Sequence, residues 1–256
     1  MSNIHKAFEN GKAFIAFVTC GDPDLETTAA VVHEAVANGA DLIELGIPFS
    51  DPTAEGPVIE AANMRALKGG VTTDKIFDFV KELRKDVSVP LVFMTYANVA
   101  FSYGTERFMA RCREAGVDGL IFPDLPFEEK EEFLAAARAE GLDLISMVAP
   151  TSENRIAMIA KEAEGFLYIV SSMGVTGTRS AITTDLASIV KTVRENTSVP
   201  CAVGFGIGTS EQARQMAAVS DGAIVGSAIV RLIEKHGRSA AKPVGEFVAS
   251  MKAALR

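Results

Sequence analysis

The sequence has few of the residues that build disulfide frameworks or metal centres. It contains three cysteines, Cys20, Cys112 and Cys201, which are widely spaced in apolar or helix-like stretches. An odd and scattered set excludes a disulfide scaffold, has no zinc-ligand spacing and favours a reducing compartment. The three histidines, His5, His33 and His236, are scattered as well. We therefore expect no metal site.

Long apolar runs and an excess of basic residues are also missing. No stretch is apolar for long enough to cross a bilayer, and the N-terminus lacks the basic and apolar regions of a signal peptide. The 33 acidic residues outnumber the 25 Lys and Arg residues, which gives a net charge of −8. Nucleic acids and anionic membranes bind clustered basic residues. We expect a cytoplasmic protein that binds neither and holds any anionic ligand locally.

No Pro- or Ser-rich linker divides the 256 residues, so we expect one domain spanning 1–256. Short apolar runs alternate with helix-length amphipathic segments, and several of the helical segments end at a glycine. The predicted strands are Ala13–Thr19, Asp41–Leu45, Pro90–Met94, Gly119–Phe122, Leu142–Met147, Phe166–Val170, Cys201–Val203 and Gly222–Val225.

Eight such units favour an α/β fold, a single (β/α)8 TIM barrel, over a doubly wound open sheet. Periodicity alone does not separate the barrel from a large open sheet. The second unit is irregular, because a Pro- and Asp-rich loop and two helical segments, Val58–Leu67 and Asp74–Lys85, follow its strand. We expect extra helices there and at the termini, and an enlarged loop of this kind is where barrel enzymes place their chemistry.

The carboxyl ends of barrel strands carry the active site, so acidic residues there are candidates for catalysis. Glu44 lies near the end of the second predicted strand, where burial would raise its pKa into the range of proton transfer. Asp51 and Glu55 follow in the same loop and could divide acid and base roles with Glu44. The alternatives are a Glu44 that faces the helices and pairs with a base, and solvated loop acids at 51 and 55.

Glycines are concentrated in the loops that follow the last three predicted strands, at 171–178, 203–210 and 225–230. Such loops let backbone N–H groups approach a phosphate, and a helix beginning near Gly226 and Ser227 would add its positive end. Each glycine taken singly could instead form only a tight turn. Three consecutive loops of this kind predict a phosphate site without a basic patch.

Aromatic residues in or just after the strands could line a flat apolar pocket for an aromatic ligand. They are Phe17, Tyr96, Phe122, Tyr168 and Phe205. Most strand aromatics are simply core. Tyr168 is the exception, because a polar phenol at a strand end near Glu44 could contact a substrate.

The longest of seven ordered motifs is ELGIPFSDPTAEGP at 44–57. The other six are Phe17–Pro23, Met94–Asn98, Pro123–Pro126, Gly174–Gly177, Gly204–Gly206 and Gly222–Val230. Together they resemble the motifs of the tryptophan synthase α subunit family, and the match extends over essentially the whole chain.

The resemblance implies a retro-aldol cleavage of indole-3-glycerol phosphate to indole and glyceraldehyde 3-phosphate. Glu44 matches the catalytic glutamate that would transfer the protons, and Tyr168 would act beside it. Glu55 stands where the family usually has Asp, and would accept the indole N–H as positive charge develops. Thr53 replaces the usual Leu, and Ser172-Met173 replaces the Arg-Ser of some relatives. The longer side chain of Glu55 requires its backbone to lie farther back.

The same resemblance assigns binding residues and a partner. Phe17, Tyr96, Thr176 and Phe205 would contact the substrate, and Gly177, Gly206, Gly226 and Ser227 would bind its phosphate. The family works as an α2β2 complex in which indole passes to a pyridoxal-phosphate β subunit, and no cofactor is expected in this chain. The residues that would face the β subunit are Asp51, Pro52, Asn98, Phe101 and Pro126.

Other functions remain open from the sequence. A sugar-phosphate isomerase or aldolase would need a metal cluster or a Schiff-base lysine, but Lys68, Lys75 and Lys130 lie in helical or loop settings. A stand-alone lyase that releases free indole, and a catalytically weak activator of the β subunit, are the nearer alternatives.

Overall fold

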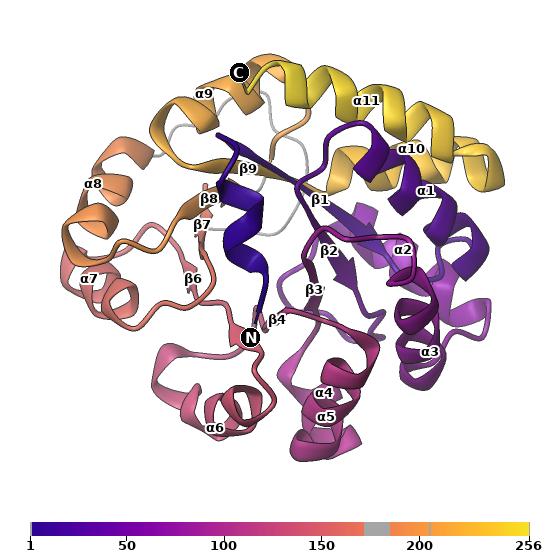
Figure 1. Cartoon of the computed structure of the whole chain (residues 1–256), viewed down its shortest axis with the longest axis horizontal. Helices are drawn as coiled ribbons and strands as arrows, with labels where there is room; N and C mark the ends of the chain where they lie inside the picture. The colour runs from indigo at the N-terminus through magenta and orange to yellow at the C-terminus, as the bar shows by residue number, and fades with distance from the viewer. Residues whose placement is uncertain (1, 172–184, 205, 256) are drawn as a thin grey trace.

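The computed structural model describes residues 2–171, 185–204 and 206–255. Its strands pair in parallel in a curved sheet of order β5-β4-β3-β2-β1-β9-β8-β7-β6, with helices around the outside (Figure 1). The strands are β1 (Ala13–Thr19), β2 (Leu42–Gly46), β3 (Leu91–Met94), β4 (Gly119–Ile121), β5 (Asp143–Leu144), β6 (Met147–Val148), β7 (Leu167–Val170), β8 (Cys201–Gly204) and β9 (Gly222–Val225).

The fifth predicted strand is present as two short pieces, β5 and β6, which together close the barrel. β5 pairs with β4 and β6 pairs with β7. Between them, the Ile145 N–H donates to the Leu120 carbonyl and the Tyr168 N–H donates to the Ser146 carbonyl. One segment therefore pairs with both of its neighbours and occupies the fifth position of an eight-position ring. The predicted (β/α)8 barrel is confirmed. The prediction of one continuous strand at Leu142–Met147 is wrong, because this segment pairs first with β4 and then with β7.

The helices begin and end with the expected local signals. Side chains cap α1, α3, α7, α8 and α9 at their N-termini, and the cap of α9 is a capping box between Thr209 and Gln212. The glycines predicted to end helices all have positive φ, as at Gly116, where φ is 83°. Among the described residues, the α-helices are α1 (Leu25–Ala37), α2 (Pro57–Lys68), α3 (Thr73–Leu83), α4 (Ala97–Tyr103), α5 (Thr105–Ala115), α6 (Glu131–Ala139), α7 (Glu153–Lys161), α8 (Leu186–Asn196), α9 (Ser210–Val219), α10 (Ser227–His236) and α11 (Ala241–Ala253).

The extra helices lie where the sequence predicts them. Both α2 and α3 follow β2, a 3₁₀ segment (Ile4–Phe8) precedes β1, and α11 packs against α1 and α10 at the C-terminal end of the chain. Within the part of the chain that the structure describes, no helix is both long enough and apolar enough to cross a membrane.

The apolar core has two layers because successive strand residues face opposite sides of the sheet. Phe14, Val18, Ile43 and Leu45 face the helices in the outer layer. The inner layer fills the barrel and includes Ile15, Leu42, Val92, Ile121, Phe166 and Tyr168. Glu44 lies at an inward position of β2, between Phe17 of β1 and Val92 of β3 in the register. The fold thus directs a carboxyl group into the barrel.

The other end of the barrel is closed by the N-terminal segment, which lies over the ring of strands in Figure 1. Ile4 is fully buried in the inner core layer. Asp118 holds this segment, because its Oδ1 accepts from the Asn3 N–H (3.0 Å) and the Asn3 Nδ2 (3.2 Å). Its Oδ2 accepts from the Leu91 N–H (3.0 Å) and from Arg84 Nη2. One buried carboxylate therefore links the N-terminus, β3 and α3 beneath the barrel.

Replacing Asp118 with Ala should lower the free energy of unfolding by roughly 3 kcal/mol, because it removes the acceptor of Arg84 Nη2, of the Asn3 side chain and of two backbone N–H groups. Urea unfolding measures this change. Asp86→Ala, at an exposed position, is the matched control and should change stability by less than about 0.5 kcal/mol. Equal stabilities for the two variants would contradict the linking role of Asp118.

Candidate active site

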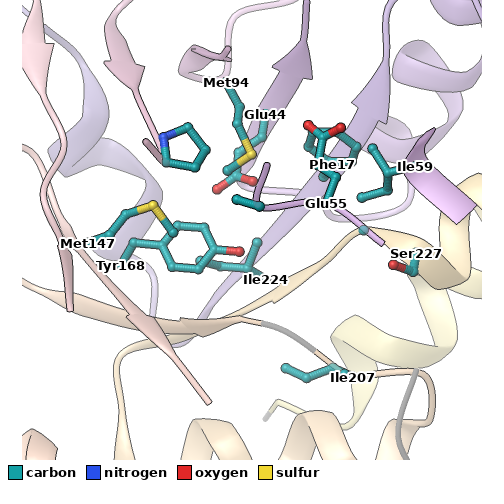
Figure 2. A pocket seen from close by; sticks show the side chains of 14 residues that line it. Phe17, Glu44, Glu55, Ile59, Met94, Met147, Tyr168, Ile207, Ile224 and Ser227 are labelled. Carbon is teal, nitrogen blue, oxygen red and sulfur yellow. The ribbon is translucent and has the colours of Figure 1, made fainter. Parts of the chain in front are cut away.

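A pocket opens at the carboxyl ends of the strands, as the barrel fold predicts (Figure 2). Most of its surface is apolar, and two carboxyl groups, a phenol and a hydroxyl face it. The described residues that line it are Phe17, Glu44, Ala54, Glu55, Ile59, Met94, Pro123, Met147, Tyr168, Gly206, Ile207, Ile224, Gly226 and Ser227. An apolar pocket with a few convergent polar groups is typical of a small-molecule site.

Glu44 is the most deeply buried acid of the pocket. It is 0% exposed, and neither carboxyl oxygen has a hydrogen-bond partner among the described residues. Burial raises the pKa of Glu44 from 4.5 to about 8, because the apolar surroundings disfavour the charged form. The group is therefore mostly protonated at neutral pH and can donate a proton to a ligand.

Glu55 reaches the same pocket from the loop between β2 and α2 (Figure 2). Its pKa is raised to about 7, mainly by burial and in smaller part by the charge of Glu60, while a hydrogen bond from Asn63 acts in the opposite direction. Asn63 Nδ2 donates to Glu55 Oε2 at 2.7 Å. A hydrogen-bond donor stabilises the ionised form, so Glu55 loses its proton more readily than Glu44. Glu55 therefore ionises at a lower pH than Glu44.

Tyr168 lies on β7 beside Glu44, with only 4% of its surface exposed. Burial and the nearby charge of Glu44 raise its pKa well above the usual value, so the phenol stays protonated. Gly204 of β8 makes room for it, since a Cβ there would lie 2.4 Å from the Tyr168 hydroxyl oxygen. The absence of a side chain at 204 is therefore a packing requirement of the site.

Phe17 forms one apolar wall of the pocket, and its ring fits there because a second strand residue, Gly46, has no side chain. A Cβ on Gly46 would lie 2.7 Å from the Phe17 ring. A Cβ on Gly226 would lie 3.3 Å from the same ring. Gly226 is also the N-cap of α10. Ser227 is the first residue of α10 and lines the pocket. The positive end of α10 therefore faces the pocket, where it can bind an anion.

Tyr96, which the family resemblance assigns to the substrate, is not among the described residues that line the pocket. Its hydroxyl oxygen instead accepts hydrogen bonds from the N–H groups of Thr53 (3.1 Å) and Ala54 (3.0 Å). Its ring packs against Phe49, with centroids 5.2 Å apart. Tyr96 thus holds the loop that carries Glu55. The predicted contacts of Thr176, Gly177 and Phe205 lie outside the described residues.

Two other sequence observations have structural counterparts. Phe122 packs against Phe133, with centroids 5.0 Å apart, and belongs to the core outside the pocket. Lys68, Lys75 and Lys130 do not line the pocket. Within the described part of the chain, no three His, Cys, Asp or Glu side chains gather to hold a metal ion.

The residues predicted to face a partner lie on loops and a helix that follow β2, β3 and β4, at the pocket end of the barrel. Asp51, Asn98, Phe101 and Pro126 are exposed and Pro52 is half-buried. Phe101 is 70% exposed, more than Met64 or Met158, the other exposed large hydrophobic residues among those the structure describes.

Comparisons with known proteins show to which family the chain belongs. The family model of the tryptophan synthase alpha chain matches residues 4–256. The chain belongs to this family. The tryptophan synthase alpha chain of Lacticaseibacillus casei is 46% identical over 255 residues, which cover 100% of this chain and 96% of that protein. That of Geotalea uraniireducens is 49% identical over 252 residues, 98% of this chain and 94% of that protein.

Solved structures of the tryptophan synthase family share the fold. The α subunit from Legionella pneumophila has a TM-score of 0.89 at 34% identity, covering 100% of this chain and 98% of that one. A chain from the tryptophan synthase α2β2 complex of Pyrococcus furiosus has a TM-score of 0.87 at 34% identity, covering 95% of this chain and 99% of that one.

Sequence reasoning missed Asn63, although a signal was present. The buried face of α2 consists of Ile59, Ala62, Asn63 and Ala66, which are spaced as one stripe of a helix. Asn63 is the only polar residue of that stripe. An amide at such a position needs a buried partner, and Glu55 is that partner.

The raised pKa of Glu44 makes the stability of the protein depend on pH. Between pH 5 and 8 the native state keeps a proton on Glu44 that the unfolded state has lost, so stability falls as pH rises. Glu44→Gln removes this dependence. The free energy of unfolding of the Glu44→Gln protein minus that of the unsubstituted protein should therefore rise by about 4 kcal/mol from pH 5 to pH 8.

Urea unfolding at several pH values measures this difference. The buried amide of Gln changes the level of stability but not its slope with pH. Glu246→Gln, at an exposed position of α11, is the control and should give a constant difference. A constant difference for Glu44→Gln as well would show that Glu44 ionises in the native protein near its ordinary pKa.

Proposed function

We propose that Glu44 and Glu55 together cleave indole-3-glycerol phosphate to indole and glyceraldehyde 3-phosphate in this pocket. The chain belongs to the tryptophan synthase alpha chain family, and this retro-aldol step is the half-reaction of that family. The observation that carries the site assignment is the pair of carboxyl groups in one apolar pocket, one without a partner and one held by an amide. Their surroundings separate their pKa values, and such a difference assigns acid and base roles.

Glu44 acts first as the acid. Its proton goes to C3 of the indole ring, and the ring nitrogen takes up the positive charge. The Glu44 carboxylate then removes the proton of the adjacent chain hydroxyl, the C3–C1′ bond breaks, and its electron pair returns to the ring. An aldehyde and neutral indole result, and Glu44 has regained its proton. The step balances with no cofactor, so we assign none to this subunit and pyridoxal phosphate to the β subunit alone.

Glu55 stabilises the charge that develops in this step. As a carboxylate it accepts the indole N–H, whose hydrogen bond strengthens as the ring becomes cationic. Cleavage thus requires Glu44 protonated and Glu55 ionised, a combination favoured between about pH 7 and pH 8 by their pKa values. Tyr168 contacts the reacting carbon chain beside Glu44, and Phe17 packs against the indole ring. The phosphate binds at Gly206, Gly226 and Ser227, with Gly177 as a further donor.

The β subunit binds over the mouth of the pocket, on Asp51, Pro52, Asn98, Phe101 and Pro126. The exposure of Phe101 favours a working complex over a stand-alone lyase. Tyr96 is the N-cap of α4, which carries Asn98 and Phe101, and its hydroxyl holds Thr53 and Ala54. Partner binding on α4 can therefore change the position of Glu55. We place the complex in the cytoplasm, where this biosynthetic step occurs.

Glu44→Gln should lower the turnover of indole-3-glycerol phosphate at least about a hundredfold, because Gln transfers no proton. Indole release measures turnover, and binding of an analogue without the chain hydroxyl groups measures whether the pocket is intact. We expect analogue affinity within about threefold of the unsubstituted protein, since the shape of the pocket is unchanged. Glu246→Gln should leave both quantities unchanged. Retained turnover in Glu44→Gln would refute the assignment.

Phe101→Glu should weaken binding of the β subunit encoded in the same genome at least tenfold, because it places a charge in an apolar contact. It should leave indole release by the α chain alone unchanged, because Phe101 does not line the pocket. Titration calorimetry measures the affinity. Met158→Glu, on α7, replaces another exposed hydrophobic residue and should bind normally. Normal binding by Phe101→Glu would place the interface elsewhere.

A further inference from the structure

Asn63 is a buried amide that contacts the active-site loop without lining the pocket. It is 3% exposed, and its Nδ2 donates to Glu55 Oε2 at 2.7 Å. The other residues on this face of α2 are apolar. Burying an amide there is unfavourable unless it is hydrogen-bonded. Glu55 is the acceptor that the structure provides.

The helix that carries Asn63 is itself held in place two residues farther along. Arg65 Nε and Nη2 donate to the two carboxylate oxygens of Asp22 at 2.8 and 2.9 Å. Arg65 Nη1 donates to Glu234 of α10 at 2.9 Å. Asp22 is 1% exposed and follows β1. A two-point bond of this kind fixes direction as well as distance, so α2 presents the Asn63 amide from a constant position.

Glu55 is thus held from two sides. The Tyr96 hydroxyl fixes the backbone at Thr53 and Ala54, just before Glu55. Asn63 fixes the far end of the side chain. Glutamate has one more rotatable bond than the aspartate that is usual in the family. The contact with Asn63 therefore removes more side-chain conformational freedom from Glu55 than it would from an aspartate.

We propose that Asn63 is a positioning residue that aims the Glu55 carboxylate at the indole N–H and holds it in the ionised form. Donation to Oε2 directs Oε1 toward the ring nitrogen. The amide also offers a donor that favours the anion, which opposes the effect of burial. This inference rests on the proposed function of the pocket.

Asn63→Ala should move the acid limb of the pH profile of kcat/KM upward by about one unit, because Glu55 loses the donor that favours its anion. Turnover at pH 6.5 should fall about tenfold, with KM changed less than about threefold, since Asn63 touches no substrate. Asn63→Leu keeps a similar shape and removes the donor without adding a charge, so it should give the same upward shift if Ala disturbs folding. The control is Asn196→Ala on α8, whose amide donates to the Thr192 carbonyl and does not line the pocket, and it should leave the profile unchanged.

A double-mutant cycle separates positioning from a merely structural role. In a Glu55→Gln background no carboxylate remains to be aimed, so Asn63→Ala should have little further effect on turnover. An equal loss in both backgrounds, or an unshifted acid limb in Asn63→Ala and Asn63→Leu, would overturn the proposal.

A measurement without substrate keeps this inference distinct from the proposed function. The carboxyl carbon of Glu55 can be followed by ¹³C NMR in glutamate-labelled protein and identified by its loss in Glu55→Gln. Its titration midpoint should rise by about one pH unit in Asn63→Ala. An unchanged midpoint would refute the role of Asn63 even in an active enzyme. A raised midpoint in a protein that releases no indole would leave Asn63 supported and refute the proposed reaction.

Discussion

The burial of a single carboxyl group inside the barrel is the constraint on which the site depends. Glu44 occupies an inward strand position where the register places Phe17 and Val92 beside it. Since the described residues offer no hydrogen bond to its oxygens, the group holds its proton at neutral pH. A partner for Glu44 would stabilise the protein and remove the acid. The pocket therefore keeps an unfavourable group for its chemistry, and the opposite end of the barrel, where Asp118 joins three elements, contributes stability away from it.

The aromatic rings of the pocket depend on glycines in the neighbouring strands. Gly46 and Gly204 lie on the strands next to Phe17 and Tyr168, and a methyl group at either position would overlap the ring. The rings therefore pack against strand backbone and line the pocket beside Glu44, where their apolar surface excludes water. Excluding water strengthens the electrostatic interactions inside the pocket. Apolar packing and proton chemistry thus rest on the same residues.

Much of this organisation could be predicted from the sequence, because the signals were local. Alternating βα segments indicated the barrel, and an acid within an apolar strand indicated Glu44. The break in the fifth strand was not predictable, because it arises from a change of partner between Leu120 and Tyr168. The family resemblance assigns Tyr96 to the substrate. Whether its hydroxyl reaches a ligand or a loop depends on how the 53–54 backbone folds over it, which no local pattern encodes. Asn63 was within reach of sequence reasoning, since it interrupts an apolar helical stripe.

The net charge of −8 excludes an extended anionic surface as a partner, yet the proposed substrate carries a phosphate. The first residues of α10 at Gly226 and Ser227 face the pocket and reconcile the two facts. Helix N-terminal N–H groups bind an anion through fixed dipoles, whose effect falls off within one turn. A lysine in the same place would also act on Glu44 and Glu55 by lowering their pKa values. Glu44 would then release its proton below neutral pH and could no longer serve as the acid. Binding the phosphate through backbone groups therefore protects the proton chemistry of the two carboxyl groups.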